Sequence, residues 1–493
     1  MRTVIGSTDH VVVIGAGLAG LSTALHLAGR GRTVTLLERG ATAGGRVGRA
    51  DRGGYRMDTG ATVLTMPDLL DETFAAVGES MRDRLTLTRL DPAYRAYFAG
   101  GEHLDVFTDA DRMVDSVRDF AGADAAAGYQ RLRSWLTRLY AAEFDGFVAA
   151  NFDSPLSLLT PTLARLTALG GFDNWEHAVA RHIDDPRLRR VFTFQSLYAG
   201  VAPQSARAAY AVIAYMDTIG GVYFPSGGMR AVPDALADAA ADAGVKIHYR
   251  TAVTGIERNG GRVQAVRTEH DERIECDAVV LTTELHRAYQ LLGHRSRRPL
   301  GLRAAPSALI VHLGCAPLDE SVAHHTISFG EAWTETFRDV IDRGRTMRDP
   351  SLLITRPTVT DPALAPPGRE LLSVLAPTPN LDRGAIDWRR TGADYAEQLL
   401  DVVRERLLPG LDAEHLELIT PADWADQEMI AGSPFALAHT FAQTGPFRPT
   451  NMINGLENVV LAGGSTVPGV GIPPTLISGR LAADRITGST SNP

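Results

Sequence analysis

Residues 10–38 read HVVVIGAGLAGLSTALHLAGRGRTVTLLE, and this stretch predicts a dinucleotide-binding unit. It begins with an apolar run of strand length, passes through the glycine pattern of residues 15–20, and continues as a helical pattern over Leu18–Gly29. The glycines permit a tight turn, the approach of backbone N–H groups to a pyrophosphate, and close packing of the helix. A second strand, Thr33–Leu37, ends on Glu38, at the spacing of about 20 residues expected for an acid that binds ribose hydroxyls.

The next turn distinguishes FAD from NAD. Gly44-Gly45-Arg46 follows Glu38 closely, and residues 54–61 read GYRMDTGA. This pairing of an acid with a downstream Gly-Gly-Arg resembles the flavin amine oxidase and phytoene desaturase superfamily. The resemblance implies that Arg46 and the flanking backbone cover the FAD phosphates, and that the Asp-x-Gly segment at residues 58–60 runs beside the isoalloxazine.

Motifs farther along the chain indicate which family of this superfamily the chain resembles most. Residues 221–229 read GVYFPSGGM, residues 323–330 read AHHTISFG, and residues 461–479 read LAGGSTVPGVGIPPTLISG. Their types and order resemble the bacterial-type phytoene desaturase (carotenoid desaturase) family over nearly the whole chain, and residues 375–379 and 433–437 also match. The chain departs from that pattern at Ala61, where the family has proline, at Val467, where histidine is more usual, and at Pro474, where glycine is more usual. These departures leave the substrate and the number of desaturation steps open.

Composition excludes several other classes of function. The 493 residues carry a formal net charge of -9, which argues against a nucleic-acid partner. The two cysteines, Cys276 and Cys315, lack metal or redox spacing, so we expect no metal site and a reducing cytoplasmic location. We find no signal peptide and no apolar stretch of the roughly 18 residues needed to span a bilayer.

We predict an α/β fold: a Rossmann-like FAD-binding domain with a discontinuous α+β substrate domain. Residues 1–66, 221–293 and 451–493 are expected to form the FAD-binding domain. Residues 67–220, which look mainly helical, and 294–450, which mix strands and helices, are expected to form the substrate and membrane-facing domain.

The cofactor residues expected from the glycine pattern and from the resemblance lie in three separate segments. Val253 is expected to present backbone groups to the adenine. The complete set is Gly15, Ala16, Gly17, Leu18, Ala19, Gly20, Glu38, Arg39, Gly44, Gly45, Arg46, Gly60, Ala61, Thr62, Val253, Gly463, Gly464, Gly471, Ile472 and Pro473.

Candidate proton acceptors are few. His324 and His325 are adjacent, so in a strand only one of them can face a cavity; either could instead be a surface or satisfied core histidine. Asp217, near the end of a helical run over 206–217, is a weaker candidate that could equally be a helix-end or solvated carboxylate. Lys246, the single lysine, lies in a predicted strand of the cofactor domain, which disfavours amine oxidation through a lysine near the flavin.

The resemblance implies an FAD-dependent desaturase acting on a long isoprenoid hydrocarbon such as phytoene, with a quinone or dioxygen reoxidising the flavin. A related isomerase, saturase or oxidase of another polyprenyl or polyene substrate is the first alternative, and a non-redox prenyl-binding protein on the same fold is the second. Residues 155–172 contain one charge, Arg165, and could form either a core helix or an interfacial helix at the cytoplasmic membrane.

Overall fold

A five-stranded parallel sheet contains the predicted dinucleotide-binding unit. In the computed structural model, which describes residues 1–154, 160–294 and 301–488, β1 (His10–Ile14), α1 (Leu18–Gly29) and β2 (Thr33–Leu37) have the predicted bounds. The sheet runs in the order β19-β13-β1-β2-β9, with every neighbouring pair parallel. Its other strands are β9 (Lys246–His248), β13 (Ala278–Leu281) and β19 (Val459–Leu461).

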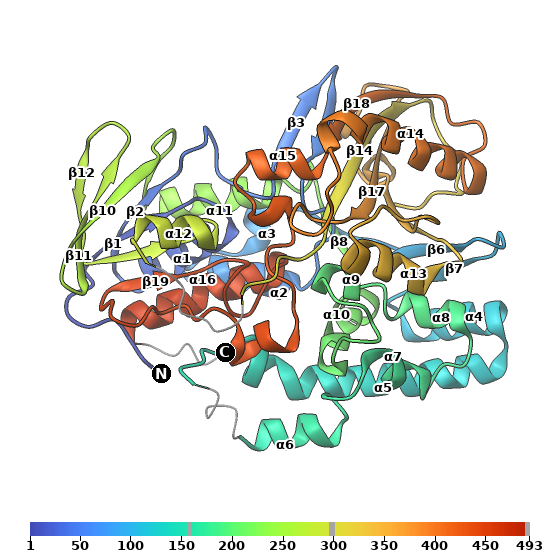
Figure 1. Cartoon of the computed structure of the whole chain (residues 1–493), viewed down its shortest axis with the longest axis horizontal. Helices are drawn as coiled ribbons and strands as arrows, with labels where there is room; N and C mark the ends of the chain where they lie inside the picture. Colours follow the sequence, from blue (N-terminus) through green and yellow to red (C-terminus); the bar gives the residue numbers. More distant parts are fainter. Residues whose placement is uncertain (155–159, 295–300, 489–493) are drawn as a thin grey trace.

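A seven-stranded sheet forms the opposite half of the molecule (Figure 1). It runs in the order β18-β14-β17-β16-β15-β6-β7, and only the β15–β6 pair is parallel. Every residue of its long strand β14, next to the edge strand β18, is buried, so the sheet is covered on both faces there. The strands are β6 (Tyr94–Phe98), β7 (His103–Val106), β14 (Ser307–Cys315), β15 (His325–Phe329), β16 (Leu352–Thr355), β17 (Glu370–Thr378) and β18 (Ala413–Ile419).

Three smaller sheets complete the β structure. A three-stranded antiparallel sheet lies at the left end of Figure 1, and two two-stranded sheets connect the halves. The expectation that residues 67–220 are mainly helical missed β5, β6 and β7, because short strands with mixed polar residues resemble loops in sequence. The strands are β3 (Arg49–Arg52), β4 (Tyr55–Asp58), β5 (Leu87–Arg89), β8 (Tyr223–Pro225), β10 (Val253–Asn259), β11 (Arg262–Thr268) and β12 (Arg273–Glu275).

Helices cover the sheets and supply a separate helical layer at the lower right of Figure 1. The expected helical run over 206–217 is broken into a 3₁₀ turn (Ala208–Ala211), α10 (Val212–Tyr215) and a π-helix (Met216–Gly220). The remaining helices are α2 (Pro67–Ala75), α3 (Met81–Arg84), α4 (Ala110–Ala121), α5 (Ala123–Glu143), α6 (Pro161–Ala168), α7 (Trp175–Ala180), α8 (Pro186–Val191), α9 (Ser196–Ala199), α11 (Ala231–Asp242), α12 (Leu285–Leu291), α13 (Trp333–Phe337), α14 (Trp388–Arg406), α15 (Pro421–Asp426) and α16 (Ile472–Thr487).

Helix α16 starts at Ile472, so Pro473 and Pro474 occupy its first turn. Proline is tolerated there because the first N–H groups of a helix have no carbonyl partner one turn earlier. The N-terminus of α16 therefore follows Gly471 of the glycine-rich loop directly.

Helix α1 is held between the turn after β1 and helix α16 by backbone contact. A Cβ on Gly20 would lie 1.9 Å from the carbonyl oxygen of Gly15, and one on Gly479 would lie 2.6 Å from that of Ala19. The hydroxyl of Ser22 donates to the carbonyl of Leu476 at 2.8 Å. Residues more than 450 positions apart are thereby fixed side by side.

No helix within the described residues is long and apolar enough to cross a membrane. Of the segment 155–172 singled out in the sequence, residues 155–159 lie outside the described residues. The following helix α6 has only Leu166 buried.

We predict that Gly20→Ala destabilises the fold. Its Cβ would overlap the Gly15 carbonyl, and overpacking of this kind costs roughly 1–3 kcal/mol. Urea titration followed by circular dichroism should show a lower midpoint. Gly410→Ala is the matched control, since a Cβ there meets nothing within 4 Å; equal midpoints for the two variants would contradict the packing argument.

Candidate FAD site and adjoining apolar pocket

Two glycine-rich turns pair at the carboxyl edge of the parallel sheet. Residues 15–20 connect β1 to α1, and Gly17 forms a parallel bridge with Gly44. The N–H of Gly44 donates to the carbonyl of Ala16 at 2.9 Å. A Cβ on Gly45 would lie 3.2 Å from the Cα of Gly17, so the turns approach this closely because both residues lack side chains.

The Glu38 carboxylate lies against the first of these turns. Its Oε2 accepts a hydrogen bond from the N–H of Ala16 at 2.8 Å, and its Oε1 accepts one from Gly40 at 2.7 Å. The N–H of Thr251 donates to the Glu38 carbonyl at 2.8 Å. The segment leading to Val253 therefore passes beside the acid, as an adenine-side contact requires.

Arg46 forms an ion pair with Glu284, which immediately precedes helix α12. A Cβ on Gly464 would lie 3.2 Å from Nη1 of Arg46, so the closing loop reaches the same guanidinium. Among the described residues, buried Nε of Arg46 and buried Oε2 of Glu284 have no hydrogen-bond partner. The Nε–H group of Arg46 and the Oε2 atom of Glu284 therefore remain available as a hydrogen-bond donor and acceptor. They lie where the segments containing Arg46, Glu284 and Gly464 meet.

The closing loop after β19 is fixed by Arg448 and by helix α16. Arg448 is buried, and its guanidinium donates to the carbonyls of Gly464 at 2.6 Å and Thr466 at 2.9 Å. The N–H of Gly463 donates to the Ser478 hydroxyl at 3.0 Å. Gly471 precedes the first turn of α16, formed by Ile472 and the two prolines, so the loop ends at a helix N-terminus.

The segment after β4 passes beneath Arg46. A Cβ on Gly60 would lie 1.7 Å from the Arg46 carbonyl oxygen, so only glycine fits there. Asp58 accepts the N–H of Met229 at 2.9 Å, and burial raises the pKa of its carboxyl to about 6. Asp58 therefore anchors residues 58–62 to the turn before α11.

Most predicted cofactor residues converge on this edge of the sheet. The exceptions are Val253, which begins β10 of the three-stranded sheet, and Arg39, whose exposed side chain pairs with Glu428 and donates to the Gln427 carbonyl at 3.1 Å. Their contribution to FAD binding stays a prediction. The residues at the edge are Gly15, Ala16, Gly17, Leu18, Ala19, Gly20, Glu38, Gly44, Gly45, Arg46, Gly60, Ala61, Thr62, Gly463, Gly464, Gly471, Ile472 and Pro473.

This arrangement fits the chemical groups of FAD. The glycine turn and the N-terminus of α1 suit a pyrophosphate, and the acid after β2 suits ribose hydroxyls. The free Nε of Arg46 is a further donor beside the phosphate position. Gly60, Ala61, Thr62 and the closing loop then border the region expected for the isoalloxazine.

The three predicted titratable candidates, His324, His325 and Asp217, are all buried, with exposed fractions of 4%, 0% and 4%. Asp217 is thus neither solvated nor at a helix end; it lies within the π-helix, because the helical run continues beyond it to Gly220. The ring of His325 lies 5.7 Å from that of Tyr94, and the Tyr94 hydroxyl in turn stands beside the Asp217 carboxyl.

The two histidines face different neighbours. His324 contacts Phe224, with ring centroids 4.5 Å apart, and its Nδ1 lies 2.7 Å from the Thr360 hydroxyl. His325 has the backbone of Thr62 beside its ring, and burial lowers the pKa of its imidazole to about 3. His325 is therefore the histidine that connects the FAD-side segment with the interior of the second half.

An apolar pocket lies between α9 and one face of the seven-stranded sheet. Tyr198, at its wall, also stands beside Asp217. Ser307, Ser351 and the Tyr198 hydroxyl are the polar side-chain groups of its lining. The lining consists of Phe194, Leu197, Tyr198, Pro306, Ser307, Ile327, Phe329, Trp333, Ser351, Leu352, Leu353, Leu375, Pro377 and Phe435.

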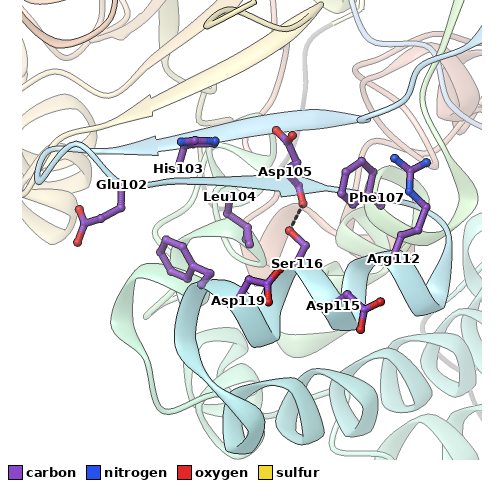
Figure 2. A pocket seen from close by; sticks show the side chains of 10 residues that line it. Glu102, His103, Leu104, Asp105, Phe107, Arg112, Asp115, Ser116 and Asp119 are labelled. Atoms are coloured by element: carbon purple, nitrogen blue, oxygen red, sulfur yellow. Dashed lines mark hydrogen bonds between the residues drawn. The ribbon is translucent and has the colours of Figure 1, made fainter.

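A second pocket, shown in Figure 2, opens at the surface between β7 and α4. Its Asp105 is bound by Arg95 at 2.6 and 2.8 Å, and its Glu102 by Arg187 at 2.8 Å. It lies at the end of the molecule opposite to β1 in Figure 1. Because these carboxylates are already neutralised and far from the glycine turns, this pocket is not part of the candidate site.

Several residues of the site were missed in the sequence. Glu284, and Thr282, whose hydroxyl donates to the Gly15 carbonyl at 3.0 Å, follow β13 directly. Their position after a parallel strand was an available signal, because ligands bind beyond the carboxyl ends of such strands. Tyr94 and Gln195 carried no such signal, since their contacts with Asp217 depend on the tertiary structure.

Comparison with known proteins gives consistent results. The sequence matches the family described as flavin containing amine oxidoreductase over residues 18–487. It is 58% identical over 492 residues to a phytoene dehydrogenase of Streptomyces griseus, covering 99% of this chain and 97% of that protein. It is 35% identical over 489 residues to a zeta-carotene-forming phytoene desaturase of Myxococcus xanthus, covering 97% and 93%. The structure resembles an oxidoreductase from Methanosarcina mazei with a TM-score of 0.66 at 17% identity, covering 96% and 99% of the two chains.

We predict that Glu38→Ala weakens FAD retention. The change removes the acceptor for two backbone N–H groups and for the ribose, and hydrogen bonds to charged groups contribute about 1.5–3 kcal/mol each. The dissociation constant, measured by flavin fluorescence during titration of the apoprotein, should rise by at least about tenfold. Glu275→Ala, at an exposed carboxylate of β12, serves as the control. An unchanged constant for Glu38→Ala would remove Glu38 from the site.

Proposed function

The chain belongs to the flavin-containing amine oxidoreductase family, and from this membership we propose that it is a desaturase of a long isoprenoid hydrocarbon such as phytoene. It would remove hydrogens from C–C bonds and so extend conjugation. The flavin chemistry follows from the family, and the substrate class is supported by the names of the two relatives described above.

The apolar pocket between α9 and the seven-stranded sheet is the observation that carries this proposal. Burial of each CH₂ group contributes about 0.8 kcal/mol, so this cavity of about 40 Å³ favours a short stretch of a hydrocarbon chain. An amine or an acid would require charged partners there, and the lining includes no charged side chain. A polyene held in the pocket would present one carbon pair to the space bordered by residues 60–62.

The protein's own groups would bind and orient both molecules. Glu38 would hold the ribose, the glycine turn and Arg46 the phosphates, and the loop fixed by Arg448 would close over the flavin. When bound, FAD supplies a two-electron acceptor for a hydride from an allylic carbon. The pocket would exclude water and align the chain, which lowers the barrier through orientation.

We propose the domain division expected from the sequence. Residues 1–66, 221–293 and 451–493 would bind FAD, and they contribute every strand of the parallel sheet. Residues 67–220 and 294–450 would hold the substrate, and they contribute every strand of the seven-stranded sheet.

Reduced FAD would pass its electrons to a quinone or to dioxygen. The sequence contains a single dinucleotide fingerprint, which favours these acceptors over NAD(P). We propose a cytoplasmic protein that contacts the cytoplasmic membrane peripherally, where both a hydrocarbon and a quinone reside. The free and buried thiols of Cys276 and Cys315 accord with a reducing compartment.

Amine oxidation is less well supported than desaturation. Lys246 lies on β9, the outer strand of the parallel sheet, and its side chain is exposed. It is therefore remote from the space that residues 60–62 border. The isomerase, saturase and oxidase alternatives share the same pocket, and product analysis separates them from a desaturase.

We predict that FAD-loaded protein incubated with phytoene in liposomes, with a quinone present, gives products absorbing at longer wavelength. Leu375→Asp should abolish turnover while retaining FAD, because an ionised carboxylate in the apolar pocket repels hydrocarbon. Leu381→Asp, at an exposed leucine, is the control. A spectrum unchanged for wild type, or one shifted to shorter wavelength, would refute desaturation.

We also predict membrane association. Wild-type protein should float with vesicles of anionic and neutral phospholipid in a density gradient, more completely when the vesicles contain phytoene. Residues 155–172 and the expected substrate motivate this prediction. Recovery of all protein in the aqueous fraction, with and without phytoene, would show that substrate is delivered without bilayer contact.

A further inference from the structure

Asp217 is a buried carboxyl with neutral neighbours. The Tyr94 hydroxyl of β6, the Gln195 side chain and Tyr198 lie near it. Among the described residues the Tyr94 hydroxyl has no hydrogen-bond partner, and the Gln195 amide donates to the Val191 carbonyl at 3.3 Å. Tyr94 and Gln195 have exposed fractions of 1% and 0%. No arginine or lysine contributes to the shift of its pKa, so no ion pair explains its burial.

This carboxyl lies at the junction of the apolar pocket and the FAD-side segment. Phe194 and Tyr198 line the pocket, and the ring of Phe194 lies 5.6 Å from that of Tyr94. The ring of His325 also lies 5.7 Å from that of Tyr94, and it lies beside the backbone of Thr62. Among the described residues, buried Oδ2 of Asp217 has no hydrogen-bond partner, which leaves one oxygen able to accept a proton.

We propose that Asp217 accepts the proton released in desaturation, and that Tyr94 and Gln195 are positioning residues beside it; this rests on the function proposed above. One carbon of the reacting pair gives up a hydride, with its two electrons, to the flavin. The neighbouring C–H bond breaks, its electron pair forms the new C=C bond, and its proton goes to Asp217 Oδ2. Two electrons and two protons then pass to a quinone, giving a quinol, so Asp217 is ionised again.

The environment of Asp217 suits this role near neutral pH. Burial raises the pKa of its carboxyl to about 7, while the Tyr94 hydroxyl and the Gln195 amide partly oppose that rise. The titratable groups that face it are Tyr94 and Tyr198, both neutral at this pH because burial raises the pKa of each phenol. A base with a pKa near the working pH is the most effective proton acceptor.

The test uses FAD-loaded, full-length protein mixed anaerobically with phytoene liposomes, with flavin bleaching followed by stopped flow. Asp217→Asn should retain FAD and bleach at least about 100-fold more slowly, as expected for loss of a general base. The wild-type rate should rise with pH through about 7. Tyr94→Phe removes a group that lowers the pKa of Asp217, so the inflection should move to higher pH.

A second readout does not depend on turnover. The infrared spectrum of the holoprotein should contain a carboxylic-acid band that titrates near pH 7 and is absent from Asp217→Asn. Glu143→Gln is the matched control, because Glu143 is also buried with a raised pKa and should bleach at the wild-type rate. If wild type bleaches and Asp217→Asn bleaches equally fast, or the band persists in that variant, Asp217 is not the acceptor. If wild type converts no phytoene in the aerobic or quinone assay, the proposed function itself fails.

Discussion

Backbone-to-backbone contact around helix α1 is the constraint on which the site depends. Gly20 brings the helix against the turn after β1, and Gly479 brings α16 against the same helix. Because of these contacts, the first turns of α1 and α16 both lie at the carboxyl edge of the five-stranded parallel sheet. A methyl group at either position would separate the glycine turn from the closing loop, and the phosphate and isoalloxazine ends of the site would lose their common support.

Near the candidate site, a small set of contacts connects the half that contains the seven-stranded sheet with the half that contains the parallel sheet. The Asp58 carboxyl ties residues 58–62 to the turn before α11, and the backbone of Thr62 lies beside His325 of the seven-stranded sheet. His325 belongs to the same strand as Ile327 and Phe329, which line the apolar pocket, so these contacts connect the sheet beneath the pocket with the glycine-rich edge. Chemistry that needs a hydrocarbon and a charged cofactor together is possible only at such a boundary, since neither environment alone holds both.

The sequence predicted the cofactor half well and the substrate half poorly. Residues 10–38 carry local signals, namely strand runs, glycines and an acid at fixed spacing, and their elements were found at the predicted bounds. Asp217 illustrates the opposite case. Its local sequence resembles a helix end, while in the structure it is buried near Tyr94 and Gln195, which are distant in sequence. Periodicity cannot report such contacts, and for the same reason β5, β6 and β7 were not anticipated.

The origin of the site in three distant stretches has a consequence for biosynthesis. A ribosome that has made residues 1–66 has produced the glycine turn and Glu38, yet Glu284 and Gly464, which meet Arg46, are still hundreds of codons away. The nascent chain therefore cannot enclose its flavin while it is being translated. Cofactor capture becomes one of the last steps of maturation, and the supply of FAD would act on completed chains rather than on their synthesis.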